Sequence, residues 1–134
     1  MNYYCEYRID PAMIISKKLS KSDLDGNVKL SKKQVISVLR KMKGVTQETL
    51  QNGIEVKVLN TAEADPNTNY RGDEYTVTLR CIGNNKFYFG VCWSTMKHSM
   101  DLNEGETLKL YWDYLEEAFI VLNIPYLVID DDVI

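Results

Sequence analysis

The hydrophobic and polar residues of this chain alternate with a period of two over much of its length, the pattern of half-buried β-strands. Seven segments combine strand length with β-branched or aromatic residues, and Gly, Asn, Asp or Pro stand between many of them. These segments are 13–19, 27–31, 53–60, 74–82, 86–93, 106–114 and 116–123. The polar segment 60–74 contains Pro and Gly, so we expect an exposed loop there.

A helical period replaces the alternation after Ser31. Apolar residues at i, i+3, i+4 and i+7 form one stripe and predict a helix that runs to about Lys43. The stripe consists of Val35, Val38, Leu39 and Met42. Ser31 is a suitable N-cap, Gln34 could complete a capping box with it, and Gly44 suits the helix end. A second short helix is expected within residues 94–105.

About seven short strands with only two helices favour one class of fold. A parallel sheet would need helices between successive strands, whereas antiparallel strands can be joined by short turns. The segment "IGNNKF" at 82–87 predicts a tight hairpin, because Gly83, Asn84 and Asn85 tolerate positive φ. We therefore predict a mainly β protein with two short α-helices, built as a small and mostly antiparallel barrel.

The size and composition of the chain are those of a single domain. Its 134 residues are 45% hydrophobic and 26% charged, so we expect one domain over 1–134, with a core at about 13–123 and an acidic tail at 124–134. No stretch reaches the roughly 18 to 20 apolar residues that span a bilayer, and the first residues lack the pattern of a secretory signal. These observations predict a soluble, intracellular protein.

Three cysteines and one histidine offer little metal or redox chemistry. Cys5, Cys81 and Cys92 stand among apolar or aromatic neighbours without a CxxC pair, so we interpret them as reduced thiols of the core. We expect neither a metal site nor a cofactor. A nucleophile pairing of Cys92 with His98 lacks an orienting acid and an oxyanion motif, and no Walker or Rossmann fingerprint is present. We therefore expect no enzymatic activity and no small-molecule substrate.

Basic residues gather in one part of an acidic chain. The formal charge of the whole is −3, yet residues 16–44 contain nine basic and two acidic residues, a charge of +7. Residues 45–134 contain six basic and fifteen acidic residues, a charge of −9. The basic segment is either the electrostatic footprint of a polyanion partner or a solvated lysine-rich face that keeps the protein soluble.

Short motifs follow one another in a recognisable order along the first part of the chain. "KKLSKSD" at 17–23 precedes a short strand and a helix, and "GIEVKVL" at 53–59 precedes a strand that ends in Leu-Arg at 79–80. Together they resemble the plant B3 DNA-binding domain. The pattern of that family begins with Lys-x-Leu-x-x-Ser-Asp and continues with a Gly-x-x-Val-x-Val-like strand and a strand ending in Leu-Arg.

The resemblance extends through the second part of the chain. "YFGVCW" at 88–93 is similar to the family strand that closes on a tryptophan. "LNEGETLKLYW" at 102–112 is similar to the family's Leu-x-x-Gly-Asp-x-Leu-x-Leu followed by an aromatic residue, with Glu106 in the place of Asp. The similarity covers roughly residues 13–123.

The resemblance implies both a fold and a function. The fold is a seven-stranded open β-barrel, the B3 pseudobarrel, with two short helices at its ends. The function is sequence-preferring binding of double-stranded DNA by a plant nuclear transcription regulator, with other transcription regulators as further partners and no membrane partner. Two arms read the major groove, an N-arm that corresponds to residues 24–30 and a C-arm that corresponds to residues 80–86.

Candidate DNA contacts are polar residues on or beside the two arms, and Lys97, shortly after the tryptophan at 93, is a further candidate for a phosphate contact. They are Lys21, Asn27, Lys29, Arg80, Asn84, Asn85, Lys86 and Lys97. The resemblance places the lysines against phosphates or guanine and Asn27 against a base edge. Each residue type also has a structural alternative, namely turn chemistry for the asparagines, a salt bridge for Arg80 and plain solvent exposure for the lysines.

A different function for the same barrel stays open at this point. The N-arm contains Asp25, and a carboxylate that faces phosphates costs affinity. A fold does not by itself imply a function. The alternative is a B3-like barrel that has lost DNA binding and acts as a protein–protein interaction module, with its acidic part facing a basic partner.

Overall fold

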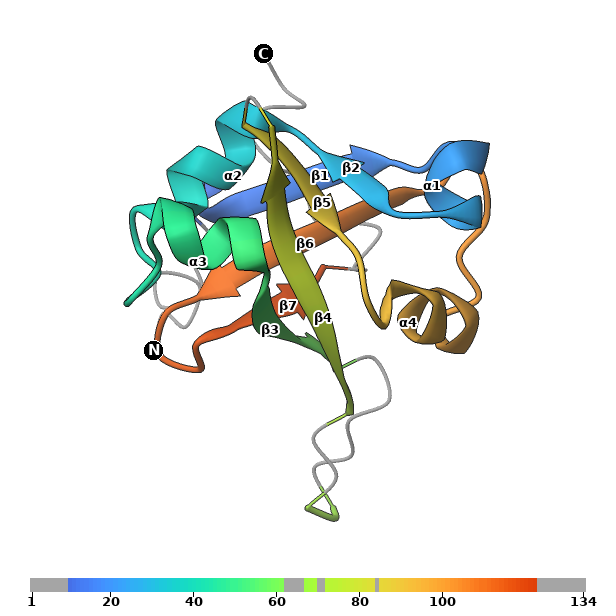
Figure 1. Cartoon of the computed structure of the whole chain (residues 1–134). Helices are drawn as coiled ribbons and strands as arrows, with labels where there is room; N and C mark the ends of the chain where they lie inside the picture. Colours follow the sequence, from blue (N-terminus) through green and yellow to red (C-terminus); the bar gives the residue numbers. More distant parts are fainter. Residues whose placement is uncertain (1–9, 62–66, 70–71, 84, 123–134) are drawn as a thin grey trace.

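Seven strands joined edge to edge in one sheet form the framework of the molecule (Figure 1). The computed structural model describes residues 10–61, 67–69, 72–83 and 85–122. Within these ranges the strands are β1 (Ile14–Lys18), β2 (Val28–Leu30), β3 (Ile54–Asn60), β4 (Asp73–Ile82), β5 (Lys86–Phe89), β6 (Thr107–Asp113) and β7 (Ala118–Val121). Each coincides with one of the seven predicted segments, which confirms the mainly β class.

The strands follow one another across the sheet in the order β1-β6-β7-β3-β4-β5-β2. Neighbours run antiparallel except for β3 and β7, which are parallel. The two edge strands, β1 and β2, approach each other, so the sheet nearly closes on itself. The prediction of a seven-stranded and mostly antiparallel barrel is therefore confirmed.

The described part of the chain contains four short α-helices, where the sequence pattern predicts two. They are α1 (Lys21–Asp25), α2 (Lys32–Leu39), α3 (Gln47–Asn52) and α4 (Trp93–Ser99), and a 3₁₀ turn at Pro11–Met13 precedes β1. α2 and α4 are the two predicted helices. α1 and α3 have five and six residues, too few for an apolar stripe, and capping boxes mark them instead, at Ser20 with Asp23 and at Thr46 with Thr49. Figure 1 shows α1 and α4 at one end of the barrel and α2 and α3 at the other.

The helix α2 departs from its prediction in two details. Ser31 caps it as expected, since its side chain accepts a hydrogen bond from the backbone N–H of Gln34 at 3.3 Å. The Gln34 side chain, however, accepts from the backbone N–H of Ser16 on β1 at 2.9 Å, so the capping box does not form and α2 is tied to the sheet. The helix ends at Leu39 because tighter i→i+3 hydrogen bonds follow it, and Gly44, with φ of +71°, lies in the turn beyond.

The segment between β5 and α4 also differs from the family pattern. β5 ends at Phe89, and Trp93 begins α4 instead of closing a strand. Cys92, between them, has a left-handed backbone with φ of +72°, which an extended strand does not allow. The thiol of Cys92 is exposed, so the prediction that it lies in the core is wrong, whereas Cys81 is buried as predicted and both are free. Cys5 lies outside the described residues.

Phe119, on β7, is fully buried in the hydrophobic core. Its ring makes edge contacts with Phe89, at 6.1 Å between ring centroids, and with Trp112, at 5.0 Å. Val35 and Val38, from the predicted apolar stripe of α2, pack against the same core. The core therefore joins the sheet to the helices at its end.

Membrane-spanning helices, metal-ligand clusters and the predicted polar segments can be assessed only over the residues that the structure describes. Within those ranges no helix is long and apolar enough to cross a membrane. Nor do three or more His, Cys, Asp or Glu side chains meet there as ligands for a metal ion. The predicted loop at 60–74 falls between β3 and β4 and lies partly outside the described ranges, and the predicted acidic tail at 124–134 lies wholly outside them.

Candidate functional site

Three adjacent strands, β2, β5 and β4, present a row of polar side chains to the outside of the barrel. Lys29 on β2 pairs with Tyr88 on β5, and Tyr88 pairs with Arg80 on β4. Residues paired directly across antiparallel strands have their side chains on the same face of the sheet. The neighbours of these three residues along each strand are buried, so the row itself points away from the core.

Three further residues extend this row into a surface. The side-chain oxygen of Asn27 lies 3.7 Å from the position that a Cβ atom on Gly90 would occupy, so Asn27 stands beside the end of β5. Lys86 pairs with Ile82 at the end of the β4–β5 hairpin, and both are exposed. We call this set the β2–β5–β4 face; it comprises Asn27, Lys29, Arg80, Ile82, Lys86 and Tyr88.

Four of the eight candidate residues meet on this face, and two residues join them that the motifs do not single out. The four are Asn27, Lys29, Arg80 and Lys86. Tyr88 and Ile82 are the additions. The alternation along each strand would have identified both, because Tyr88 stands between two inward phenylalanines and Ile82 stands two residues after Arg80.

Arg80 also supports a neighbouring helix. Its Nε donates a hydrogen bond to the backbone carbonyl of Gln51, 3.2 Å away in the last turn of α3. Carbonyl groups in the last turn of a helix have no partner within the helix, so this bond holds α3 against β4. The structural contact of Arg80 is thus a backbone carbonyl, and its guanidinium has further N–H groups to offer a ligand.

The β4–β5 hairpin is tight, as predicted. Gly83 and Asn85 both have φ of +59°. The Asn85 side-chain oxygen accepts a hydrogen bond from the Cys81 thiol at 4.0 Å. Asn85 therefore has the turn role that was its structural alternative, and its DNA contact stays a prediction. Asn84 lies outside the described residues.

A buried carboxylate sets the position of β2. Asp23 is 3% exposed, and its two oxygens accept hydrogen bonds from the backbone N–H groups of Ser20, at 2.9 Å, and Lys29, at 3.4 Å. Lys17 Nζ on β1 lies 3.4 Å from the carboxylate. Burial alone would raise the pKa of Asp23, but the hydrogen bonds with Ser20 and Lys29 and the charge of Lys17 outweigh it and hold the pKa below its ordinary value. Asp23 thus links α1, β1 and β2.

Replacing Asp23 with asparagine is expected to lower the free energy of unfolding by about 1–3 kcal/mol at neutral pH, because the amide has one acceptor oxygen for two N–H groups. Since folding lowers the pKa of Asp23, its contribution to stability is present above the ordinary value of 3.8 and is lost as the pH falls below it. The difference in urea midpoint between the wild type and Asp23→Asn should therefore shrink in acid. Asp25→Asn, at an exposed site on the same helix, is the control, and a difference that is constant with pH would contradict the role of the charge.

The helix α4 is docked on α1 through two backbone carbonyl groups. Trp93 Nε1 donates to the carbonyl of Asp23 at 2.8 Å, and Lys97, one turn further along α4, donates to the carbonyl of Leu24. Both carbonyls lie near the end of α1, where helical partners are lacking. The ammonium group of Lys97 is therefore engaged within the protein, and its phosphate contact stays a prediction. Lys21 is exposed at the start of α1.

Sequence comparisons relate the chain to curated proteins of Arabidopsis thaliana, although no family model matches it. B3 domain-containing protein At1g43171 is 57% identical over 115 residues, which is 86% of this chain and 96% of that protein. B3 domain-containing protein At5g54067 is 51% identical over 123 residues, 90% of each. Putative B3 domain-containing protein At1g50220 is 54% identical over 123 residues, but these make up 92% of this chain and only 57% of that protein.

Two solved structures share the fold. The crystal structure of the Arabidopsis thaliana transcription factor LEC2 in complex with DNA has a TM-score of 0.56 at 15% identity, and the match covers 88% of this chain and all of that one. The Arabidopsis FUS3–DNA complex has a TM-score of 0.55 at 17% identity, with 79% of this chain and 91% of that one covered. The identity to the curated relatives is high enough to establish kinship. The chain belongs to the B3 domain-containing proteins.

Proposed function

We propose that this B3 domain binds double-stranded DNA with a sequence preference and acts in a nuclear transcription regulator. The LEC2 and FUS3 structures are complexes with DNA, and LEC2 is a transcription factor. The observation that carries the proposal is the β2–β5–β4 face, on which parts of both predicted arms lie on adjacent strands with three cationic side chains around Tyr88. Such a surface suits phosphate contacts and hydrogen bonds to base edges.

The residues of the face have distinct proposed roles. Lys29 and Lys86 neutralise phosphates, together with Lys21 beside the N-arm. Asn27, Asn85 and also Asn84, which lies outside the described residues, offer amides that can pair with base edges in the major groove. Ile82 is 47% exposed at the end of β4, where an aliphatic side chain can contact the methyl group of thymine.

The acidic composition of the chain does not oppose this role. Of the two acidic residues in the basic segment 16–44, Asp23 is buried and paired with Lys17, and Asp25 alone is exposed, against nine basic residues in the same segment. Charges elsewhere in the protein act on DNA only weakly beyond a Debye length of roughly 8 Å in physiological salt. The basic face can therefore approach a duplex despite the formal charge of −3.

The proposal is tested by selection from random-sequence duplex DNA at moderate salt. A short motif should become enriched, and Asn27→Ala and Asn84→Ala should each weaken binding to it by about 1–3 kcal/mol if they remove a base contact. Gln47→Ala removes an exposed amide outside both arms and is the matched control. Weak, salt-sensitive binding without any enriched motif would contradict sequence-preferring recognition.

A second candidate function, protein–protein interaction, is favoured by one observation. Tyr114 and Leu115, in the turn between β6 and β7, are 64% and 80% exposed. Large apolar side chains exposed at two consecutive positions of a turn favour a contact with another protein. This turn carries acidic residues. It has no residue in common with the β2–β5–β4 face.

A further inference from the structure

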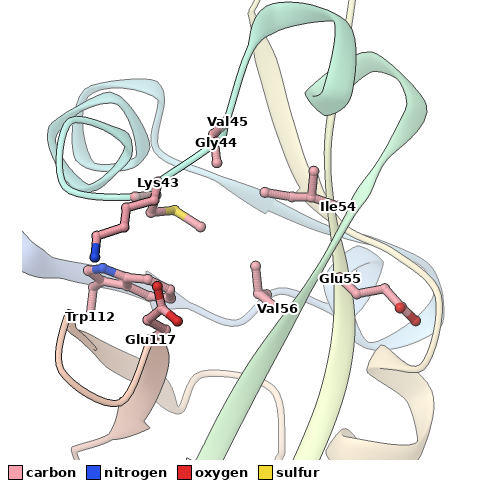
Figure 2. Close-up of a pocket in the computed structure, with 9 residues that line it drawn as sticks. Lys43, Gly44, Val45, Ile54, Glu55, Val56, Trp112 and Glu117 are labelled. Atoms are coloured by element: carbon pink, nitrogen blue, oxygen red, sulfur yellow. The ribbon is translucent and has the colours of Figure 1, made fainter.

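The indole N–H of Trp112, on β6, is buried without a hydrogen-bond partner among the described residues. The side chain is only 5% exposed. An unpaired donor in a protein interior is destabilising and uncommon. Trp93 shows the usual arrangement, since its N–H donates to the carbonyl of Asp23. The Trp112 N–H is therefore a donor whose hydrogen bond the described residues leave unmade, and a ligand reaches it by displacing the Lys43 side chain that lies over the indole nitrogen in Figure 2.

Trp112 lines a pocket at the end of the barrel that carries α2 and α3 (Figure 2). The volume of the pocket is about 210 Å³, and its apolar walls are Met42, Val45, Ile54 and Val56. An apolar cavity of about 150 Å³ binds benzene. The pocket is thus large enough for a phenyl or branched aliphatic group.

Two opposite charges accompany the Trp112 donor. Lys43 and Glu117 both line the pocket, and Figure 2 shows their side chains turned toward the indole ring, whereas the Glu55 carboxylate points away. A ligand that satisfies this set must accept from the indole N–H and from the Lys43 ammonium and must donate to the Glu117 carboxylate. A peptide amide does both without carrying a net charge.

The surroundings of the pocket indicate the chemistry of the rest of the ligand. Between Trp112 and Glu117 the chain forms the exposed turn of Tyr114 and Leu115, and Asp113 Oδ1 holds this turn by accepting from the backbone N–H groups of Leu115, at 3.0 Å, and Glu116, at 3.3 Å. Three acidic side chains lie in or beside the turn. A ligand that passes over it gains from positive charge and from apolar contact.

We propose that this pocket binds a basic segment of a partner protein through one aromatic or branched aliphatic residue. The side chain of that residue enters the pocket, its carbonyl accepts from the Trp112 N–H, and its own N–H donates to Glu117. Flanking lysines or arginines of the segment face the acidic turn. The inference gives a site to the second candidate function and rests on it, and DNA binding by the β2–β5–β4 face does not enter into it.

The test is a titration of the ¹⁵N-labelled chain with the peptide acetyl-Lys-Arg-Phe-Arg-Lys-amide, followed by the two indole N–H signals in nuclear magnetic resonance spectra. The spectrum of Trp112→Phe assigns the signals. The Trp112 signal should shift and saturate, while the Trp93 signal, from an indole already bonded within the protein, stays in place. Absence of a saturable shift at millimolar peptide, or equal shifts of both signals, would overturn the inference.

Three comparisons separate the parts of the proposal. Replacing the phenylalanine of the peptide by glycine should weaken binding by at least about tenfold, because the apolar anchor is lost. Trp112→Phe should weaken binding of the basic peptide by about tenfold, because the indole donor is lost. This binding is measured on the backbone signals of Val45 and Ile54. Neutral acetyl-phenylalanine amide should bind roughly tenfold more weakly than the basic peptide, and equal affinities would show a small-molecule site rather than a basic partner.

Discussion

Reversing the charges of Lys29 and Lys86 together is expected to weaken binding to the selected duplex by roughly one to two orders of magnitude in about 0.1 M salt. The two side chains lie on adjacent strands of the β2–β5–β4 face and are both exposed. Each phosphate contact releases counterions and contributes about 0.9 to the slope of log affinity against log salt concentration. The slope of the double variant should therefore be smaller by about 2 in fluorescence anisotropy titrations.

The matched control changes the net charge of the protein equally at other places. Lys41, after α2, and Lys57, on β3, are also exposed and lie outside both arms. The variant with glutamate at these two positions should retain most of the affinity and of the salt slope. If both double variants lose affinity to the same extent, binding follows the overall charge of the protein and the assignment of this face is wrong.

Replacing Trp93 with alanine is expected to lower the free energy of unfolding by about 3–5 kcal/mol, because the side chain is 1% exposed and a cavity would remain. Trp93→Phe keeps an aromatic ring but removes the N–H that donates to the Asp23 carbonyl, and should cost about 1–3 kcal/mol. Both losses are measured by urea unfolding. Both substitutions should also weaken the contact between α4 and α1, and thereby the support for the start of the N-arm.

The two tryptophans of the chain provide the control for this experiment. Trp112→Phe removes a similar part of a buried indole ring, but its N–H has no partner among the described residues. Trp112→Phe should therefore cost less stability than Trp93→Phe. Equal costs would mean that the bond between Trp93 and Asp23 adds nothing to the docking of α4.

The strands were predictable from the sequence, and the shortest helices were not. Period-two alternation is a direct consequence of burying one face of a strand, so each strand can be recognised from its own alternating pattern. A helix of five residues, such as α1, makes barely more than one turn and leaves no stripe. Its only local signal is the capping box of Ser20 and Asp23, and the Lys-x-Leu-x-x-Ser-Asp motif includes Asp23 but leaves the position of Ser20 unspecified.

The candidate site was predictable in its position and less so in its contacts. Resemblance and alternation place Lys29 and Lys86 on exposed strand positions, where the structure has them. The partners of Arg80 and Lys97 are backbone carbonyls of helices that lie far away in the sequence, so they emerge only from the tertiary arrangement. The same holds for Trp112, whose N–H lacks a partner among the described residues because of its tertiary surroundings and not because of any motif.

The place of β7 in the sheet determines when the barrel can form. It is the last of the described strands in the chain, yet it lies between β6 and β3 and is the sole hydrogen-bonded link between the two strands β1-β6 and the four strands β3-β4-β5-β2. A nascent chain on the ribosome that still lacks Ala118–Val121 has two separate sheets, with the edges of β6 and β3 open to pairing with other molecules. Contacts between distant parts of a chain also slow folding. The barrel should therefore close only after synthesis has passed β7, and the interval before closure is the time at which this protein is most exposed to aggregation.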